Sequence, residues 1–255
     1  MKKIIIVGNW KMNLTVHESS LLVHRLNAFV KTHRDIEVVL APGFIALQPI
    51  SLEIDHRKFK LAAQNGYAKD EGAFTGEVSF TQLRGLVSYA IIGHSERRKY
   101  FNETLESVRD KVQAAVRNDI IPILCVGETK EEHLAGETRR VVHDQVTTAL
   151  TNLTADEIAN VVIAYEPVWA IGTGTAEKPD EVAKVITWIR HVVRELYGEE
   201  LATNQRVIYG ASVEPQFVKG LLEVKGLDGF LIGGASLIYT KFADIIDNVY
   251  QFTHL

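Results

Sequence analysis

Eight short apolar runs, spread along the whole chain, restrict the fold more than any other feature of the sequence. They read IIIVGN from Ile4, VVLAP from Val38, KLAAQN from Lys60, YAIIGH from Tyr89, IPILCVGE from Ile121, NVVIAYEP from Asn160, RVIYGAS from Arg206 and GFLIGGAS from Gly229. Most are apolar without alternation over about five residues, which is typical of strands that are covered on both faces. The runs therefore indicate a parallel sheet.

Amphipathic helices separate several of these runs. One helical face is formed by Leu105, Val108, Val112, Ala115 and Val116. A second is formed by Val182, Val185, Ile186, Ile189, Val192, Val193 and Leu196. Pro179, followed by two acidic residues, predicts the start of that second helix. Strands and helices that alternate over 255 residues predict an α/β fold, a (β/α)8 barrel. A doubly wound open sheet stays as the alternative, because alternation does not decide closure.

Composition narrows the class of partner and the compartment. The net charge of -4 argues against nucleic acid or an anionic membrane as an obligate partner. No apolar run approaches the roughly 18 residues of a membrane span, and the run from Ile4 to Val7 is too short for a signal peptide. The single cysteine, Cys125, has no partner for an internal disulfide, so we expect a cytoplasmic protein. No linker divides the chain, and we expect one barrel domain over residues 1–255.

Polar and glycine residues follow almost every apolar run. They are Asn9, Asn65, His94, Glu166, Ser212, Gly233 and Gly234. In a barrel, the carboxyl ends of all strands open onto one face, where active sites are built. Polar residues also end strands for purely structural reasons, which is enough to explain Asn65 and Ser212. The same structural reason does not explain well why Lys11, His94 and Glu166 all occur at strand ends, so these three residues are the leading candidates for catalysis.

Each candidate has a structural alternative. Lys11 in GNWKMN follows a strand end and can contact an anion, although an isolated loop lysine is usually just solvated. His94 precedes a helix whose cap we expect to be Ser95, with Glu96 in the first turn. The positive end of that helix favours a neutral imidazole, which can donate to a carbonyl oxygen, but a structural histidine fits equally well.

The stretch YEPVWAIGTGTA, residues 165 to 176, combines a carboxylate with a stiff joint and a flexible tip. Pro167 restricts the backbone at Glu166, Trp169 is an apolar anchor, and Gly172 and Gly174 loosen the chain. This pattern predicts a lid hinged beside a base. Backbone N–H groups of Gly172, Ser212, Gly233 and Gly234 can together bind a phosphate. There is no P-loop, no zinc spacing and no carboxylate pattern for a dedicated metal cage.

Six motifs resemble the triosephosphate isomerase family in order along nearly the whole chain. They are GNWKMN, GAFTGE, IIGHSERR, ILCVGET, YEPVWAIGTG and DGFLIGGASL. The resemblance implies a TIM barrel that interconverts dihydroxyacetone phosphate and D-glyceraldehyde 3-phosphate through an enediolate, in glycolysis and gluconeogenesis. It implies Glu166 as the general base, His94 as the proton shuttle and Lys11 as the positive charge. It further implies that Asn9 helps to orient the lysine, that Glu96 is a supporting carboxylate, and that no metal or organic cofactor is required.

The resemblance also implies a homodimer. The segment Gly66 to Val78 carries Ala73 and Phe74 in a loop, where exposed apolar residues usually mark an interface. In the family this loop docks beside the active site of the neighbouring subunit, with the residue that matches Thr75 near that subunit's lysine. The expected partners are thus the triose phosphate and a second copy of the chain.

Three departures from the family pattern remove no chemical group. The second lid hinge reads Thr175-Ala176-Glu177 rather than Lys-Thr-Ala, Ser79 precedes Phe80 rather than proline, and Ala211 replaces a glycine after the seventh strand. We expect Ala211 to bias its loop toward one of two states, because a Cβ resists positive φ. The alternatives are another phosphate-binding barrel, such as an aldolase or a biosynthetic isomerase, and an inactive barrel that acts as a scaffold.

Overall fold

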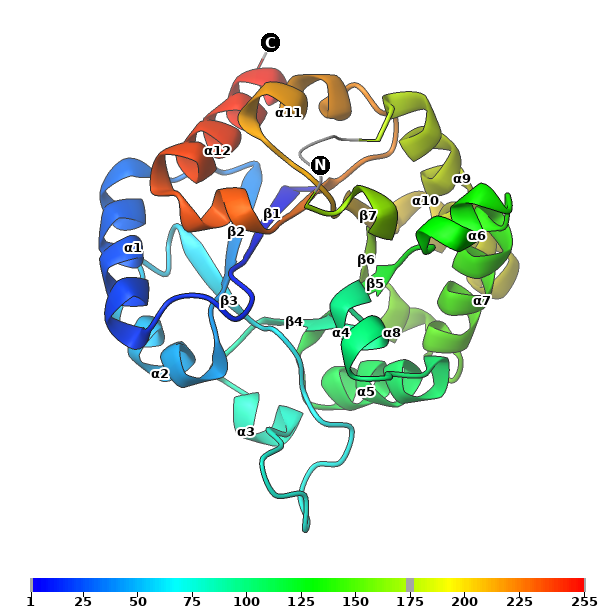
Figure 1. The fold of residues 1–255 in the computed structure, drawn as a ribbon, viewed down its shortest axis with the longest axis horizontal. Coiled ribbons are helices and arrows are strands. Elements are labelled where there is room, and N and C mark those ends of the chain that lie inside the picture. The colour runs from blue at the N-terminus through cyan, green and yellow to red at the C-terminus, as the bar shows by residue number, and fades with distance from the viewer. Residues whose placement is uncertain (1, 173–176, 255) are drawn as a thin grey trace.

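A closed parallel barrel forms the centre of the molecule in a computed structural model that describes residues 2–172 and 177–254 (Figure 1). Its strands are β1 Ile4–Asn9, β2 Ile36–Ala41, β3 Phe59–Ala63, β4 Tyr89–Ile92, β5 Ile121–Val126, β6 Val162–Tyr165, β7 Arg206–Tyr209 and β8 Gly229–Ile232. Each strand pairs with the next, and β8 pairs with β1 from Ile5↔Gly229 to Gly8↔Ile232. The prediction of an α/β, (β/α)8 fold is confirmed, and the open doubly wound sheet is wrong.

Helices surround the barrel on the outside (Figure 1). They are α1 Val16–Phe29, α2 Phe44–Glu53, α3 Phe80–Leu83, α4 Ser95–Tyr100, α5 Leu105–Arg117, α6 Lys130–Leu134, α7 Thr138–Leu150, α8 Ala155–Ile158, α9 Pro179–Tyr197, α10 Glu199–Asn204, α11 Pro215–Leu222 and α12 Tyr239–Thr253, with short 3-10 helices η1 Val168–Ala170 and η2 Gly234–Leu237. The predicted helical faces are those of α5 and α9, and α9 begins at Pro179 as expected. None of the helices in the described part of the chain is both long and apolar enough to cross a membrane.

Alternation along the strands divides the core into two layers. Ile5, Val7, Ile123 and Cys125 belong to the cluster inside the barrel, whereas their neighbours in sequence pack outward against the helices. Both layers are buried, which explains why the strands read as uninterrupted apolar runs. Cys125 is therefore a packed strand residue.

The predicted runs extend too far at their carboxyl ends. The last regular residues of β4, β6 and β7 are Ile92, Tyr165 and Tyr209, so His94, Glu166 and Ser212 lie in the loops that leave the barrel. Residues 66–78 form the long loop that projects below α3 in Figure 1. The predicted lid tip and most of its second hinge, residues 173–176, lie outside the described residues.

Candidate active site

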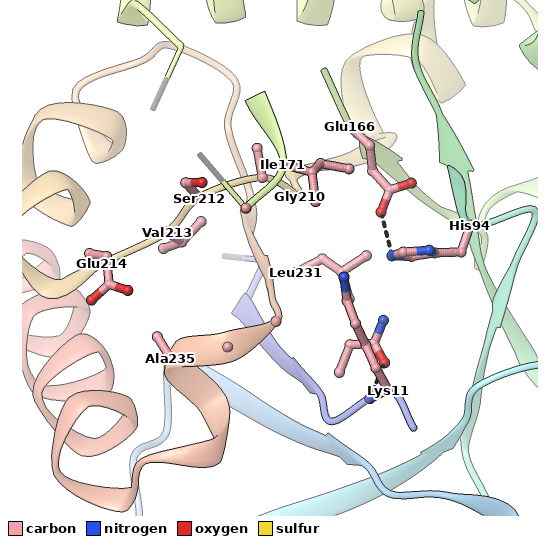
Figure 2. A pocket seen from close by; sticks show the side chains of 15 residues that line it. Lys11, His94, Glu166, Ile171, Gly210, Ser212, Val213, Glu214, Leu231 and Ala235 are labelled. Atoms are coloured by element: carbon pink, nitrogen blue, oxygen red, sulfur yellow. Dashed lines mark hydrogen bonds and ion pairs between the residues drawn. The ribbon is translucent and has the colours of Figure 1, made fainter. Parts of the chain in front are cut away.

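One cavity of about 260 Å³ opens at the carboxyl ends of the strands (Figure 2). Eight of the nine residues predicted for the site line it, namely Asn9, Lys11, His94, Glu166, Gly172, Ser212, Gly233 and Gly234. The ninth, Glu96, lies behind Lys11 and contacts the lysine rather than the cavity. Side chains from β1 and from the loops after β4, β6, β7 and β8 thus meet in one place, as the barrel topology predicted.

Lys11 is held by its neighbours in an unusual backbone conformation. Its φ is +54°, which costs a non-glycine residue free energy. The Oδ1 atom of Asn9 accepts from the Lys11 N–H at 3.1 Å, and Gln64 donates to the Lys11 carbonyl at 2.8 Å. The Lys11 ammonium is 2.6 Å from Glu96 Oε1. Gln64, which the sequence analysis missed, is therefore part of the support that presents the lysine to the cavity.

His94 has a defined tautomer. It caps α4 itself, because its Nδ1 accepts a hydrogen bond from the Glu96 N–H at 3.2 Å. The predicted cap, Ser95, is wrong, since Ser95 is the first residue of the helix. An Nδ1 atom that accepts a main-chain proton carries none of its own, so the proton of the neutral ring is on Nε2. That nitrogen points at Glu166 (Figure 2).

Glu166 is almost completely buried, with 1% of its surface exposed, and its carboxylate is hydrogen-bonded on both oxygens. Oε1 lies 3.1 Å from His94 Nε2, and Oε2 accepts from the Ser95 N–H at 3.0 Å. The Glu166 main chain is fixed as well, because its N–H donates to the Val126 carbonyl at 2.7 Å. A buried carboxylate beside a donor of this kind is the arrangement that general acid–base catalysis requires.

A close approach of two strand ends sets the position of Glu166. A Cβ on Gly127 would lie 1.9 Å from the Glu166 carbonyl oxygen, so only glycine fits there. Gln145 fixes the Gly127 peptide, because its Oε1 accepts a hydrogen bond from the Gly127 N–H at 2.7 Å. The strand end that carries the carboxylate therefore packs directly on the end of β5.

The opposite end of the cavity is lined by main chain and small residues. Gly233 and Gly234 lie at the start of η2, and the alkyl chain of Lys11 runs close to Gly233. The Ser212 hydroxyl donates to the Ala170 carbonyl at 2.9 Å, which connects the loop after β7 to the predicted lid just after Trp169. Glu214 also lines the cavity, but Lys241 pairs with its carboxylate at 2.8 Å.

Glu128, which the sequence analysis did not single out, anchors the predicted lid. It is fully buried and accepts from the Trp169 indole N–H at 3.0 Å and from the Tyr165 hydroxyl at 3.2 Å. Burial and the charge of Glu128 raise the pKa of Tyr165, so this phenol stays protonated as a donor. At the other end of the lid, the Glu177 N–H donates to the Tyr209 hydroxyl at 3.0 Å.

Cys125 lies close to the site without the properties of a nucleophile. Burial, followed by the charge of Glu166, raises the pKa of its thiol well above the ordinary value. The neutral thiol is a poor nucleophile and a poor metal ligand. Among residues 2–172 and 177–254, no three histidine, cysteine or acidic side chains are arranged to hold a metal ion.

Comparisons with known proteins agree on one family. The family model described as triosephosphate isomerase matches residues 4–249. The triosephosphate isomerase of Clostridium tetani is 46% identical over 97% of both chains. Those of Clostridium acetobutylicum and Clostridium beijerinckii are 45% and 42% identical over 97% of this chain and all of theirs. The chain belongs to the triosephosphate isomerase family.

Proposed function

We propose that this chain interconverts dihydroxyacetone phosphate and D-glyceraldehyde 3-phosphate, with Glu166 as the base that moves the proton. Glu166 takes a proton from the carbon beside the carbonyl group and returns it to the neighbouring carbon. The proton on His94 Nε2 forms a hydrogen bond to the substrate oxygen and is exchanged between the two oxygens of the enediolate. The Lys11 ammonium offsets the negative charge that develops there.

The observation that carries the proposal is the contact of 3.1 Å between His94 Nε2 and Glu166 Oε1 in a cavity that Lys11 also lines. A base and a proton donor at this separation can act on adjacent carbon and oxygen atoms of one small substrate. The two groups bond each other here, so substrate has to displace the Glu166 carboxylate from His94 and the Ser95 N–H. The carboxylate is then free to take up the substrate proton.

The substrate phosphate is assigned to the glycine-rich end of the cavity. Gly172, Ser212, Gly233 and Gly234 supply main-chain N–H groups around that end, and the pairing of Glu214 with Lys241 reduces repulsion of a dianion. Closing the predicted lid over the phosphate excludes water and protects the enediolate from loss of phosphate. The first hinge of the predicted lid is Pro167-Val168-Trp169, and the second ends at Glu177.

A coupled isomerase assay on D-glyceraldehyde 3-phosphate tests the proposed reaction. We expect turnover without added metal and after treatment with a chelator. Cleavage or condensation of a sugar phosphate without triose isomerisation would favour an aldolase. Binding of the triose phosphate with no turnover would favour the inactive scaffold, and either result would overturn the proposal.

The proposal includes a homodimer in the cytoplasm. Large apolar side chains are exposed after four consecutive strands, namely Met12 after β1, Ile45 after β2, Phe74 after β3, and Tyr100 and Phe101 after β4. Neighbouring strands place them on one side of the barrel, around the projecting loop of residues 66–78. Apolar surface of this kind marks an interface. Sedimentation at micromolar concentration should give twice the chain mass, whereas a fully active monomer would contradict the assembly.

A further inference from the structure

The guanidinium of Arg98 donates hydrogen bonds to three main-chain carbonyl groups. In α4, Arg98 Nη1 donates to the carbonyl oxygens of Gly93 and Cys125, the latter at 2.9 Å, and Nη2 donates to the Gly127 carbonyl at 3.1 Å. Among the described residues, no carboxylate forms an ion pair with this arginine. A planar, always charged guanidinium holds several acceptors in a fixed geometry, whereas a lysine ammonium is a point charge on a flexible stem.

The three carbonyl groups belong to the strand ends that carry the catalytic pair. Gly93 directly precedes His94 at the end of β4. Gly127, at the end of β5, packs against the main chain of Glu166. Arg98 therefore connects the segment that bears the histidine to the segment on which the glutamate rests.

We propose that Arg98 is a positioning residue of the active site, whose guanidinium fixes the spacing between His94 Nε2 and Glu166 Oε1 by holding the ends of β4 and β5 together. This inference rests on the proposed isomerase function and deepens it. Arg98 does not line the cavity, so it acts through the two residues that do. Loosening this connection displaces the proton donor from the base, and a displacement of about 1 Å can cost about 100-fold in rate.

Arg190 offers a matched control at the other end of the barrel. Its Nη1 donates to the Ala202 carbonyl at 2.7 Å, and its Nη2 donates to the Gly226 carbonyl at 2.9 Å. It also pairs with Asp228, just before β8 begins. Replacing either arginine by lysine therefore removes the planar fork that bonds several main-chain carbonyl groups, but only Arg98→Lys removes it beside His94 and Glu166, and a lysine at position 190 can still pair with Asp228.

The test compares Arg98→Lys and Arg190→Lys in thermal unfolding and in steady-state isomerase kinetics. We expect both variants to unfold at lower temperature than the wild type. Only Arg98→Lys should lower kcat, by about 10- to 100-fold, with KM changed by about twofold or less because the phosphate-binding groups are untouched. Millimolar guanidinium chloride should restore part of the kcat of Arg98→Ala and leave that of Arg190→Ala unchanged.

Equal kcat values in Arg98→Lys and Arg190→Lys would overturn the inference, as would a loss confined to KM or the absence of guanidinium rescue in a folded Arg98→Ala. If the lysine variant does not fold, Arg98→Gln, which keeps a planar amide donor, takes its place under the same criteria. An inactive wild-type enzyme would instead overturn the proposed function, so the two failures are distinguishable.

Discussion

Replacing Gly127 by alanine should reduce the rate of isomerisation without removing any catalytic group. The new Cβ would meet the Glu166 carbonyl oxygen at 1.9 Å, whereas real contacts of this kind are essentially never below 3.0 Å. One of the two strand ends must therefore retreat by about 1 Å. Overpacking of this kind typically costs about 1–3 kcal/mol of stability. A misplacement of about 1 Å at the base predicts a kcat about 100-fold lower than wild type.

A graded series separates this effect from glycine replacement in general. A Cβ on Gly210 would lie 3.1 Å from Glu166 Cγ, which is a milder clash, so Gly210→Ala should lower kcat less than Gly127→Ala. Gly220→Ala in α11 is the control, because its Cβ meets no atom within 4 Å. The measurements are thermal unfolding and coupled isomerase kinetics for all three variants. A folded Gly127→Ala enzyme with a kcat within threefold of wild type would refute the reasoning.

Three further outcomes are expected. Gly220→Ala should raise the free energy of unfolding by about 0.5–1 kcal/mol, because alanine restricts the unfolded chain, and a lower value in urea unfolding would contradict this. Ala211 does not have a positive φ in this structure. If its loop visits positive φ during catalysis, Ala211→Gly should change kcat, or the affinity for a phosphate-bearing transition-state mimic, by about fivefold. Unchanged kinetics and affinity would show that alanine is neutral there. Burial opposes ionisation of Glu37 on β2, but hydrogen bonds from Lys60 and Tyr89 outweigh it and hold the pKa of Glu37 below its ordinary value. This carboxylate therefore stabilises the fold above its unfolded-state pKa and loses that effect as the pH falls through the folded-state pKa. The difference in the free energy of unfolding between wild type and Glu37→Gln should become smaller from pH 6 to pH 3, and a constant difference would contradict this prediction.

The sequence predicted the barrel, and most of the predicted site residues line the cavity, because both depend on local pattern plus topology. Uninterrupted apolar runs identified strands buried on both faces, and the carboxyl ends of parallel strands necessarily share one face. That reasoning was sufficient to bring Asn9, His94 and Glu166 together across more than 150 residues. It overestimated strand length, because apolar and glycine residues continue past the point where the chain turns away from the barrel.

Contacts between strand ends could not be predicted, since they depend on register and on side-chain direction. The close approach of Gly127 to Glu166 and the bonds of Arg98 to two strand ends are examples. Glu128 is a different case, because a signal was available. It closes the run IPILCVGE as Glu166 closes the run from Asn160, and the same rule applied to it would have predicted a buried carboxylate near the site.

The kcat of Glu166→Gln tests the central claim most directly. Glutamine keeps the size of the side chain and one oxygen to accept from the Ser95 N–H, but it cannot take up the substrate proton. Glu106→Gln, at an exposed position in α5, is the control for loss of a single negative charge. We predict a folded Glu166→Gln enzyme with a kcat about 10²- to 10⁴-fold below wild type and a control equal to wild type. A folded Glu166→Gln enzyme with near wild-type kcat would contradict the account.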